Sequence, residues 1–215
     1  MNTLPTVTKN LLIINVLMFA AQFVAAQQNI DLVYHLGLFF IGTGNFEVWQ
    51  PVTYMFLHGG FMHLFFNMFG LWMFGRILET VWGPKRFLIY YVVCGVGAAL
   101  TQELVQWLTW LSLDGVPTNS YAYYSVIAPT VGASGAIYGI LLAFGRLFPN
   151  ERLFIFPIPM PIKAKWFISF FIVLAIYQGL AATDNVAHFA HLGGMIFGFL
   201  LISYWKNKGY GRFRY

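Results

Sequence analysis

Charged residues are scarce in this chain. Asp, Glu, Lys and Arg make up only 9% of its 215 residues, whereas 59% are hydrophobic and 20% are aromatic. A soluble globular domain averages about 25% charged residues. The composition therefore excludes an ordinary soluble enzyme and indicates an integral membrane protein.

Cysteine is nearly absent as well. The one cysteine, Cys94, has no partner for an internal disulfide, and we expect it to be a small packing residue. Five histidines would allow a zinc site, but the sequence has neither a His-Glu-x-x-His motif nor a set of cysteine ligands. We therefore expect no metal and no other cofactor.

Six apolar segments are long enough to cross a bilayer, which takes roughly 17–25 residues. They cover residues 8–27, 61–80, 87–110, 131–147, 166–183 and 187–205. We predict an all-α membrane protein, a bundle of six transmembrane helices that forms one domain over residues 1–215. The first segment is too long for a signal peptide and lacks a convincing cleavage site, so we expect it to be retained.

Basic residues are distributed unevenly between the connections. With the N-terminus inside, all 12 Lys and Arg residues fall on the inner side. The outer side carries Asp31, Glu47, Asp114 and Asp184 and no basic residue. This pattern follows the positive-inside rule and predicts that both termini lie inside. The net charge of +5 therefore reflects topology and contact with lipid, and does not indicate nucleic-acid binding.

Two long connections face the outer side. Residues 28–60 are largely apolar and aromatic, so we expect this loop to lie in the interface or against the bundle. Residues 111–130 are typical of an ordinary surface connection. On the inner side, the three prolines between Phe154 and Ile162 separate the fourth and fifth segments, because proline breaks helices.

Two polar residues stand at the start of glycine-rich apolar segments, Ser134 in the fourth and His191 in the sixth. An ionisable side chain inside a bilayer is costly and is by default a functional-site hypothesis. A serine hydroxyl becomes a good nucleophile when an adjacent base takes its proton. By spacing alone His188 could also be the base, but His191 is deeper and adjoins the close-packing face of its helix.

Four polar groups are predicted to share one layer of the bundle. Measured from the basic residue at each inner end, Ser134 lies about 18 Å away and His191 about 22 Å away, at 1.5 Å per residue. By the same measure, His63 and Asn67 of the second segment lie about 20 and 14 Å away. His63 and Asn67 are four residues apart and so share a helix face.

Small residues at intervals of four favour close contact between the fourth and sixth segments. They are Gly135 and Gly139 in the fourth segment, and Ala190, Gly194 and Gly198 in the sixth. Such spacing lets two membrane helices touch backbone to backbone. We expect this packing to bring the Ser134 hydroxyl within hydrogen-bond reach of an imidazole.

An oxyanion formed at Ser134 would meet the unpaired N–H groups of a helix start. His63 and Asn67 would supply side-chain donors, and the loss of one such donor typically costs about 3–4 kcal/mol. Taken singly, each motif has an ordinary alternative. Gly-x-Ser-Gly is also a packing device, Asn67 a helix-helix link, and His63 a packing residue or metal ligand. His35 lies in an outer loop, where a structural or solvated role is expected.

Together the motifs resemble those of the rhomboid family of intramembrane serine proteases, in the family's order and over nearly the whole chain. The matching segments are Gly132-Ala133-Ser134-Gly135 with Tyr138, Ala190-His191-xx-Gly194-xxx-Gly198, His63-xxx-Asn67, Glu79-xxx-Gly83, and His58 ahead of them. One departure is Trp49-Gln50-Pro51, where the family commonly has Trp-Arg. The missing arginine puts the rigidity of the first outer loop in question more than the chemistry.

The resemblance implies a Ser134–His191 catalytic dyad without a third carboxylate. It implies an oxyanion site made by His63, Asn67 and the Ser134 backbone N–H, with Tyr138 packed beside His191. The supporting residues that it implies are Gly132, Gly135, His58, Gly194 and Gly198.

The expected activity is hydrolysis of peptide bonds in or next to the transmembrane segments of membrane-protein substrates. The substrate must unwind locally near the outer surface, and the Phe-rich fifth segment with the 181–187 connection are the expected moving parts. Expected partners are such substrates and the lipid bilayer, with no nucleic acid and with the oligomeric state open. The compact form favours a bacterial inner membrane, with the site open to the periplasmic side. The alternatives are a catalytically silent rhomboid-like binder of membrane helices and a small transporter, although no inverted repeat is evident.

Overall fold

A computed structural model describes residues 4–154, 160–181 and 187–208 of the protein. The described chain is mostly helical, and five of its helices are long and apolar enough to cross a membrane. Four of them are α1 (Thr6–Gln27), α6 (Pro84–Leu111), α9 (Ala164–Ala181) and α10 (His188–Asn207). The fifth is a continuous helix made of α4 (Phe61–Gly70), a π-helical turn η3 (Leu71–Gly75) and α5 (Arg76–Trp82). These correspond to five of the six predicted spans.

The remaining predicted span, residues 131–147, forms a shorter helix, α8 (Ser134–Leu147). Its 14 residues extend about 21 Å, less than the roughly 30 Å hydrocarbon core. The backbone before it is not helical: Gly132 has φ +124°, and its N–H donates to the Tyr54 carbonyl at 2.9 Å. Non-helical backbone at membrane depth is tolerated where it is buried in protein or lines a cavity.

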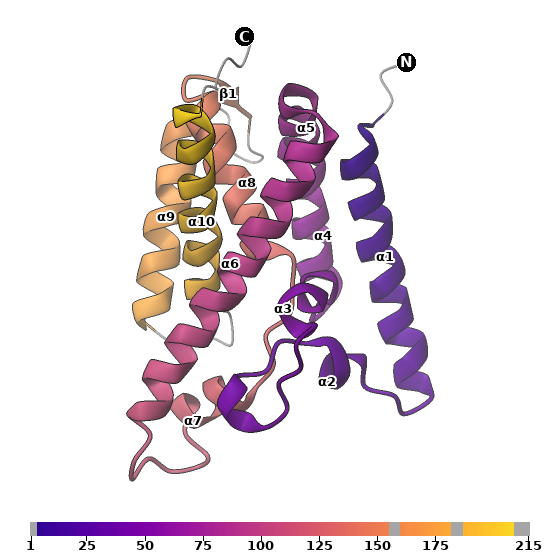
Figure 1. Ribbon diagram of the computed structural model, residues 1–215, viewed down its shortest axis with the longest axis vertical. Coiled ribbons are helices and arrows are strands. Elements are labelled where there is room, and N and C mark those ends of the chain that lie inside the picture. Colours follow the sequence, from indigo (N-terminus) through magenta and orange to yellow (C-terminus); the bar gives the residue numbers. More distant parts are fainter. Residues whose placement is uncertain (1–3, 155–159, 182–186, 209–215) are drawn as a thin grey trace.

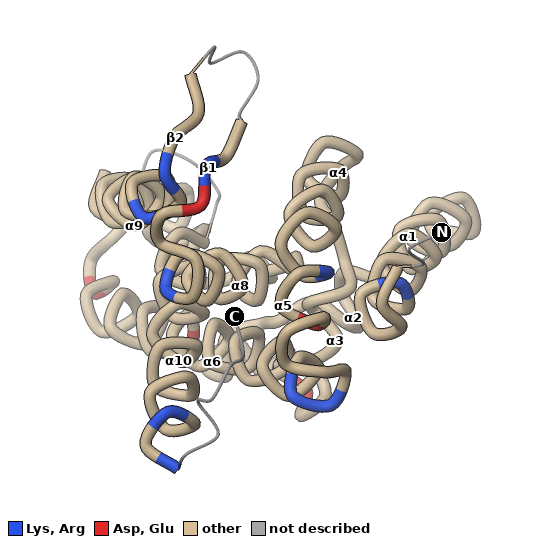
Figure 2. The backbone as a smooth tube through the Cα atoms, turned by 90° about the horizontal axis from the view of Figure 1, so that it is seen from above, with Lys and Arg blue, Asp and Glu red and all other residues tan. Residues whose placement is uncertain are grey.

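Helix α8 lies in the interior of the bundle, between α4 on one side and α9 on the other, with α6 and α10 packed against it (Figures 1 and 2). The small residues make these contacts close. A Cβ at Gly194 would overlap the Gly135 carbonyl, and one at Gly139 would overlap Cys94. Cys94 is buried at this contact, in the packing position that we expected. Helix α1 stands at the edge of the bundle and is little buried (Figure 1).

The two long connections meet at the end of the bundle opposite the start of α1 (Figure 1). The first contains α2 (Leu32–Leu36), η1 (Ile41–Thr43), α3 (Gln50–Thr53) and η2 (Tyr54–Phe56), and the second contains α7 (Tyr121–Ile127). Leu38 and Thr130 exchange backbone hydrogen bonds of 2.9 and 2.8 Å, which join the two connections. Residues 111–130 are therefore more than a surface connection, because they form a helix and are tied to the first loop.

The first loop is held without the arginine of the family motif. Gln50 is fully buried; its Oε1 accepts from the Phe39 N–H at 3.1 Å and its Nε2 donates to the Asn45 carbonyl at 3.0 Å. Next to it, the Trp49 Nε1–H donates to the His35 carbonyl at 3.1 Å. A neutral amide thus anchors the loop at the position where its rigidity was in question.

At the other end of the bundle, β1 (Arg152–Leu153) and β2 (Ile162–Lys163) form a short antiparallel hairpin that the sequence did not predict. Seen from this end, Lys and Arg mark the helix ends and the hairpin (Figure 2). Asp31, Glu47 and Asp114 lie in the connections of the opposite end. The basic residues of the described ranges thus gather at one end, where Glu79 and Glu151 also lie, whereas Asp184, Arg212 and Arg214 fall outside the described ranges.

Candidate active site

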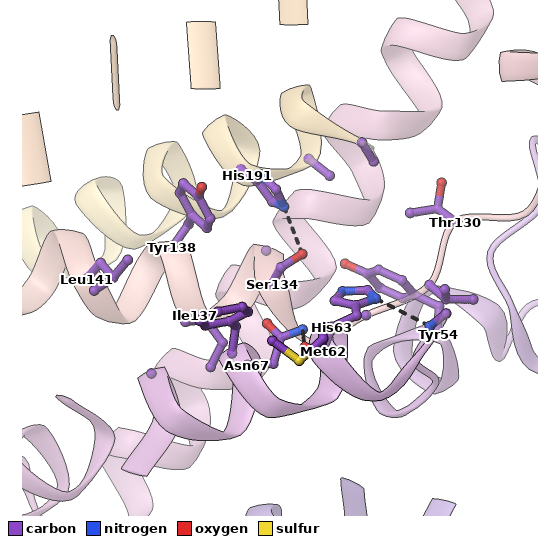
Figure 3. Close-up of a pocket in the computed structure, with 18 of the residues that line it drawn as sticks. Tyr54, Met62, His63, Asn67, Thr130, Ser134, Ile137, Tyr138, Leu141 and His191 are labelled. Carbon is purple, nitrogen blue, oxygen red and sulfur yellow. Dashed lines mark hydrogen bonds between the residues drawn. The ribbon is translucent and has the colours of Figure 1, made fainter. Parts of the chain in front are cut away.

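A cavity of about 1230 Å³ extends along α8. It is lined by residues of α4, α6, α8, α9 and α10 and by the segment between α7 and α8. Four of its lining residues are the polar groups predicted to share a layer: His63, Asn67, Ser134 and His191 (Figure 3). The cavity brings them together from three different helices.

Ser134 and His191 lie within hydrogen-bond distance of each other. Ser134 is the first residue of α8, and His191 lies in the first turn of α10. The distance between Ser134 Oγ and His191 Nε2 is 2.8 Å (Figure 3). The contact of α8 with α10 through Gly135 and Gly194 allows this approach, because any side chain there would separate the two helices.

Tyr138 packs directly against the His191 ring. Tyr138, one turn after Ser134, stacks on the imidazole with centroids 4.1 Å apart and an interplanar angle of 6°. Phe171 of α9 packs edge-on against Tyr138 at 5.9 Å. The ring of His188 lies 5.9 Å from that of His191 and is nearly perpendicular to it. Of the two histidines that spacing allowed, His191 is the one that contacts Ser134.

His63 reaches the cavity from the first turn of α4. The backbone N–H of Gly59 donates to His63 Nδ1 at 3.3 Å. Nε2 of the same ring faces Gly132: a Cβ built there would lie 2.7 Å from Nε2 and 3.7 Å from Ser134 Oγ. His63 Nε2 and the serine hydroxyl therefore border the same small space, which glycine leaves empty.

Asn67 lies one helical turn after His63 and is only 5% exposed. Its Nδ2 donates to the His63 carbonyl at 3.1 Å. An amide nitrogen has two hydrogens, so a second N–H remains for another acceptor in the cavity. The first-turn N–H groups of α8 begin at Ser134, where the helix dipole is positive.

His58 lies behind His63 and does not line the cavity. It is 2% exposed, and its ring packs edge-on against His63 with centroids 5.1 Å apart. Burial, reinforced by the neighbouring His63, lowers the pKa of His58 to about 4. A nearby Phe56 carbonyl offsets only part of this effect. His58 is therefore neutral at neutral pH and packs as an uncharged ring.

Within the described ranges, His, Cys, Asp and Glu form no cluster that could hold a metal ion. His35 is exposed in the first loop, as expected for a solvated residue.

The sequence did not indicate a role for Tyr54, whose hydroxyl donates to the Gly95 carbonyl at 2.8 Å and whose own carbonyl accepts from the Gly132 N–H. It also missed Gln102 of α6, which lines the cavity. Neither belongs to a local motif, so no sequence signal marked them.

Aromatic side chains line the rest of the cavity along the bundle. Phe66 and Phe69 come from α4, and Phe167 and Phe171 come from α9. Phe66 is 62% exposed, so this wall opens to the surroundings of the bundle. Deeper in, the rings of Phe74 and Phe167 stack with centroids 6.4 Å apart and join the two sides.

Comparison with known proteins gives a consistent result. A family model described as "Rhomboid domain" matches residues 45–207. The chain is 32% identical over 146 residues to "Rhomboid protein 1, mitochondrial" of Saccharomyces cerevisiae, covering 67% of this chain and 38% of that protein. It is 30% identical over 169 residues to "Putative rhomboid protease YdcA" of Bacillus subtilis, covering 75% of this chain and 69% of that protein. For "Rhomboid protease GluP" of the same organism, the identity is 29% over 155 residues, 71% of this chain and 25% of that protein. The chain thus spans well under half the length of the yeast protein and of GluP.

Proposed function

This chain belongs to the rhomboid family, and from that premise we propose that it is an intramembrane serine protease with a Ser134–His191 dyad. The observation that carries the proposal is the 2.8 Å contact between Ser134 Oγ and His191 Nε2 in a cavity of a membrane-type bundle. Relatives named as rhomboid proteases support the same reading.

In the proposed mechanism, His191 Nε2 takes the hydroxyl proton while Ser134 Oγ attacks the substrate carbonyl carbon. The tetrahedral oxyanion collapses, the C–N bond breaks, and the amine leaves with the proton from His191. Water, activated by the same imidazole, then hydrolyses the acyl-enzyme and frees Ser134. Each proton that the imidazole takes is returned, so no cofactor is required.

No acidic residue occurs in α8 or α10, so the proposed dyad lacks a third carboxylate on its own helices. We assign the orienting role to Tyr138, because a parallel stack at 4.1 Å restricts rotation of the His191 ring. A supporting group that fixes the base is the usual third component of such a site.

The proposed oxyanion site consists of His63 Nε2–H, the second Asn67 N–H and the Ser134 backbone N–H. Support comes from the shared space between His63 and Ser134 beside Gly132 and from the position of Ser134 at a helix start. Donors aimed at developing charge are usually the largest single contribution to such catalysis.

The proposed substrate is a transmembrane segment that enters between α4 and α9. The aromatic wall of Phe66, Phe69 and Phe171 is chemically suited to an apolar segment. A helix hides its carbonyls in hydrogen bonds, so segments weakened by Gly, Pro or small polar residues should be cut preferentially.

The proposed topology has six crossings with both termini inside. It rests on the beginning of α1 and the end of α10 at one end of the bundle (Figure 1) and on the basic residues there. We further propose a bacterial inner membrane as the location, with the cavity facing outward.

The test is cleavage of a model transmembrane substrate by the purified protein in liposomes. We expect the wild type to cut, and Ser134→Ala and His191→Ala to reduce kcat by at least about 10³-fold. Ser169→Ala, which removes an exposed serine of α9, is the matched control and should cut normally. Cleavage that survives Ser134→Ala would defeat the mechanism. Solute flux without proteolysis would favour a transporter, and substrate binding without cleavage a silent relative.

A further inference from the structure

Gln22 joins the edge helix α1 to the segment that precedes α4. Its side-chain amide makes two hydrogen bonds to the backbone of His58, 36 residues away. Gln22 Nε2 donates to the His58 carbonyl at 3.2 Å, and Gln22 Oε1 accepts from the His58 N–H at 3.0 Å. Gln22 lies outside the residues that match the family model.

The bond to the His58 carbonyl also fixes the next N–H group. The carbonyl of His58 and the N–H of Gly59 belong to one planar trans peptide, so they point in opposite directions from a rigid unit. When Gln22 holds the carbonyl, the Gly59 N–H points away from it, toward His63 Nδ1 at 3.3 Å. Gly59 and Gly60 have the freedom of glycine, so the local chain does not fix this orientation.

A backbone N–H only donates, so His63 Nδ1 is an acceptor in this contact and carries no proton. In the neutral ring the proton must then be on Nε2. Nε2 is the ring nitrogen that borders the space beside Gly132 and Ser134 Oγ. The contact therefore presents an N–H donor to that space, where the opposite tautomer would present a lone pair.

We propose that Gln22 is a positioning residue that holds the His58–Gly59 peptide so that His63 presents a protonated Nε2 to the cavity. The consequence for catalysis rests on the proposed function, since it requires His63 to donate to the oxyanion. The statement about the tautomer of His63 does not depend on proteolysis.

The test variant is Gln22→Met, which keeps the length of the side chain but removes both hydrogen bonds. The matched control is Asn15→Leu, which removes a buried amide of α1 whose Nδ2 donates to the Leu11 carbonyl of the same helix and which does not contact the His58 backbone. Both variants lose a side-chain amide of α1, but only Gln22→Met removes the hydrogen bonds to His58. Thermal unfolding in detergent compares their effects on stability.

The first measurement is 15N NMR of histidine-labelled protein, with His63 assigned by difference against His63→Gln. We expect the wild type to show the tautomer protonated at Nε2, and Gln22→Met to shift the His63 signals toward a mixture of both tautomers. Asn15→Leu should leave them unchanged. His63 signals that are unchanged in Gln22→Met, or a wild type protonated at Nδ1, would overturn the inference.

The second measurement is the kinetics of substrate cleavage. Gln22→Met should lower kcat about tenfold with KM nearly unchanged, less than the 100-fold or greater loss typical of removing an oxyanion donor. An activity loss that follows thermal stability equally in Gln22→Met and Asn15→Leu would reduce Gln22 to a structural role and overturn the proposal. If no form of the protein cleaves but the NMR result holds, the proposed function fails while the tautomer assignment stands.

Discussion

Gly132 is the residue at which backbone and chemistry constrain each other most tightly. Its φ of +124° is a conformation that residues with a Cβ rarely adopt, and its N–H is held by the Tyr54 carbonyl. A methyl group there would also lie 2.7 Å from His63 Nε2. Substitution would therefore strain the chain and displace a ring that borders Ser134.

We expect Gly132→Ala to lower kcat by at least about 100-fold, the effect of losing one oxyanion donor. Gly115→Ala is the matched control, because Gly115 also has a positive φ of +74° but nothing lies within 4 Å of its Cβ position. Gly115→Ala should lose about 1–2 kcal/mol of stability through left-handed backbone strain, yet cleave normally. Equal cleavage by the two variants would show that His63 tolerates the methyl group.

The buried His58 predicts a pH dependence of stability. Its pKa in the folded protein is about 4, below the ordinary value of about 6.5, because burial disfavours the charged ring. Between these two values the unfolded chain binds more protons than the folded one, so stability must fall as the pH drops through that window.

Thermal unfolding in mild detergent between pH 7 and pH 4 measures this effect. His58→Gln should show a smaller loss of melting temperature across the window than the wild type. His35→Gln, which changes an exposed histidine, should retain the wild-type slope. If His58→Gln and His35→Gln have the same slope, His58 is not the group that titrates.

Among the elements, α1 depends on polar contacts near both of its ends because so little of it is buried. At its start, the buried Glu79 of α5 accepts from the N–H groups of Val7 and Thr8 at 2.9 and 2.7 Å and from the Thr8 hydroxyl at 2.8 Å. First-turn N–H groups have no partner within a helix, and a carboxylate there also complements the dipole. The Glu-xxx-Gly motif thus caps a helix from a distance.

Glu79→Gln should destabilise the protein by about 3 kcal/mol, because hydrogen bonds to a charged group contribute roughly 1.5–3 kcal/mol each and the amide keeps only one acceptor oxygen. Glu151→Gln, at an exposed carboxylate, is the control and should change stability by less than about 0.5 kcal/mol. The free energy of unfolding in mixed micelles checks both. A similar small change in the two variants would contradict the capping role.

Sequence patterns predicted the elements whose signal is local. Apolar runs predicted six spans, of which five are long helices and the sixth is the shorter α8. The spacing of Gly135, Gly139 and Gly194 predicted the close packing of α8 with α10, whereas Gly198 packs against Tyr90 and Cys94 of α6. The apolar run overestimated the length of α8 by three residues at its start, although the oxyanion argument had placed Ser134 at a helix start. Helix α7 and the β1–β2 pair were not predicted, because their sequences carry no strong periodicity.

At the scale of the whole molecule, the depth count placed His63, Asn67, Ser134 and His191 in one layer, and all four line one cavity. Helical rise and charge topology sufficed for that placement. They could not reveal which atoms meet. The Gln22–His58 and Gly59–His63 contacts join side chains to backbone across loops, and backbone partners leave no trace in the sequence.

The bundle as a whole brings the Ser134 hydroxyl of α8 and the His191 imidazole of α10 into one cavity. Substrate identity does not enter that claim, so a small reactive probe tests it most directly. The measurement is mass spectrometry of the purified protein after treatment with a fluorophosphonate, which modifies serines activated by a neighbouring base. We predict one adduct, on Ser134, in the wild type and its loss in His191→Ala. A wild type unmodified at Ser134, or equal modification of Ser134 without His191, would contradict the account.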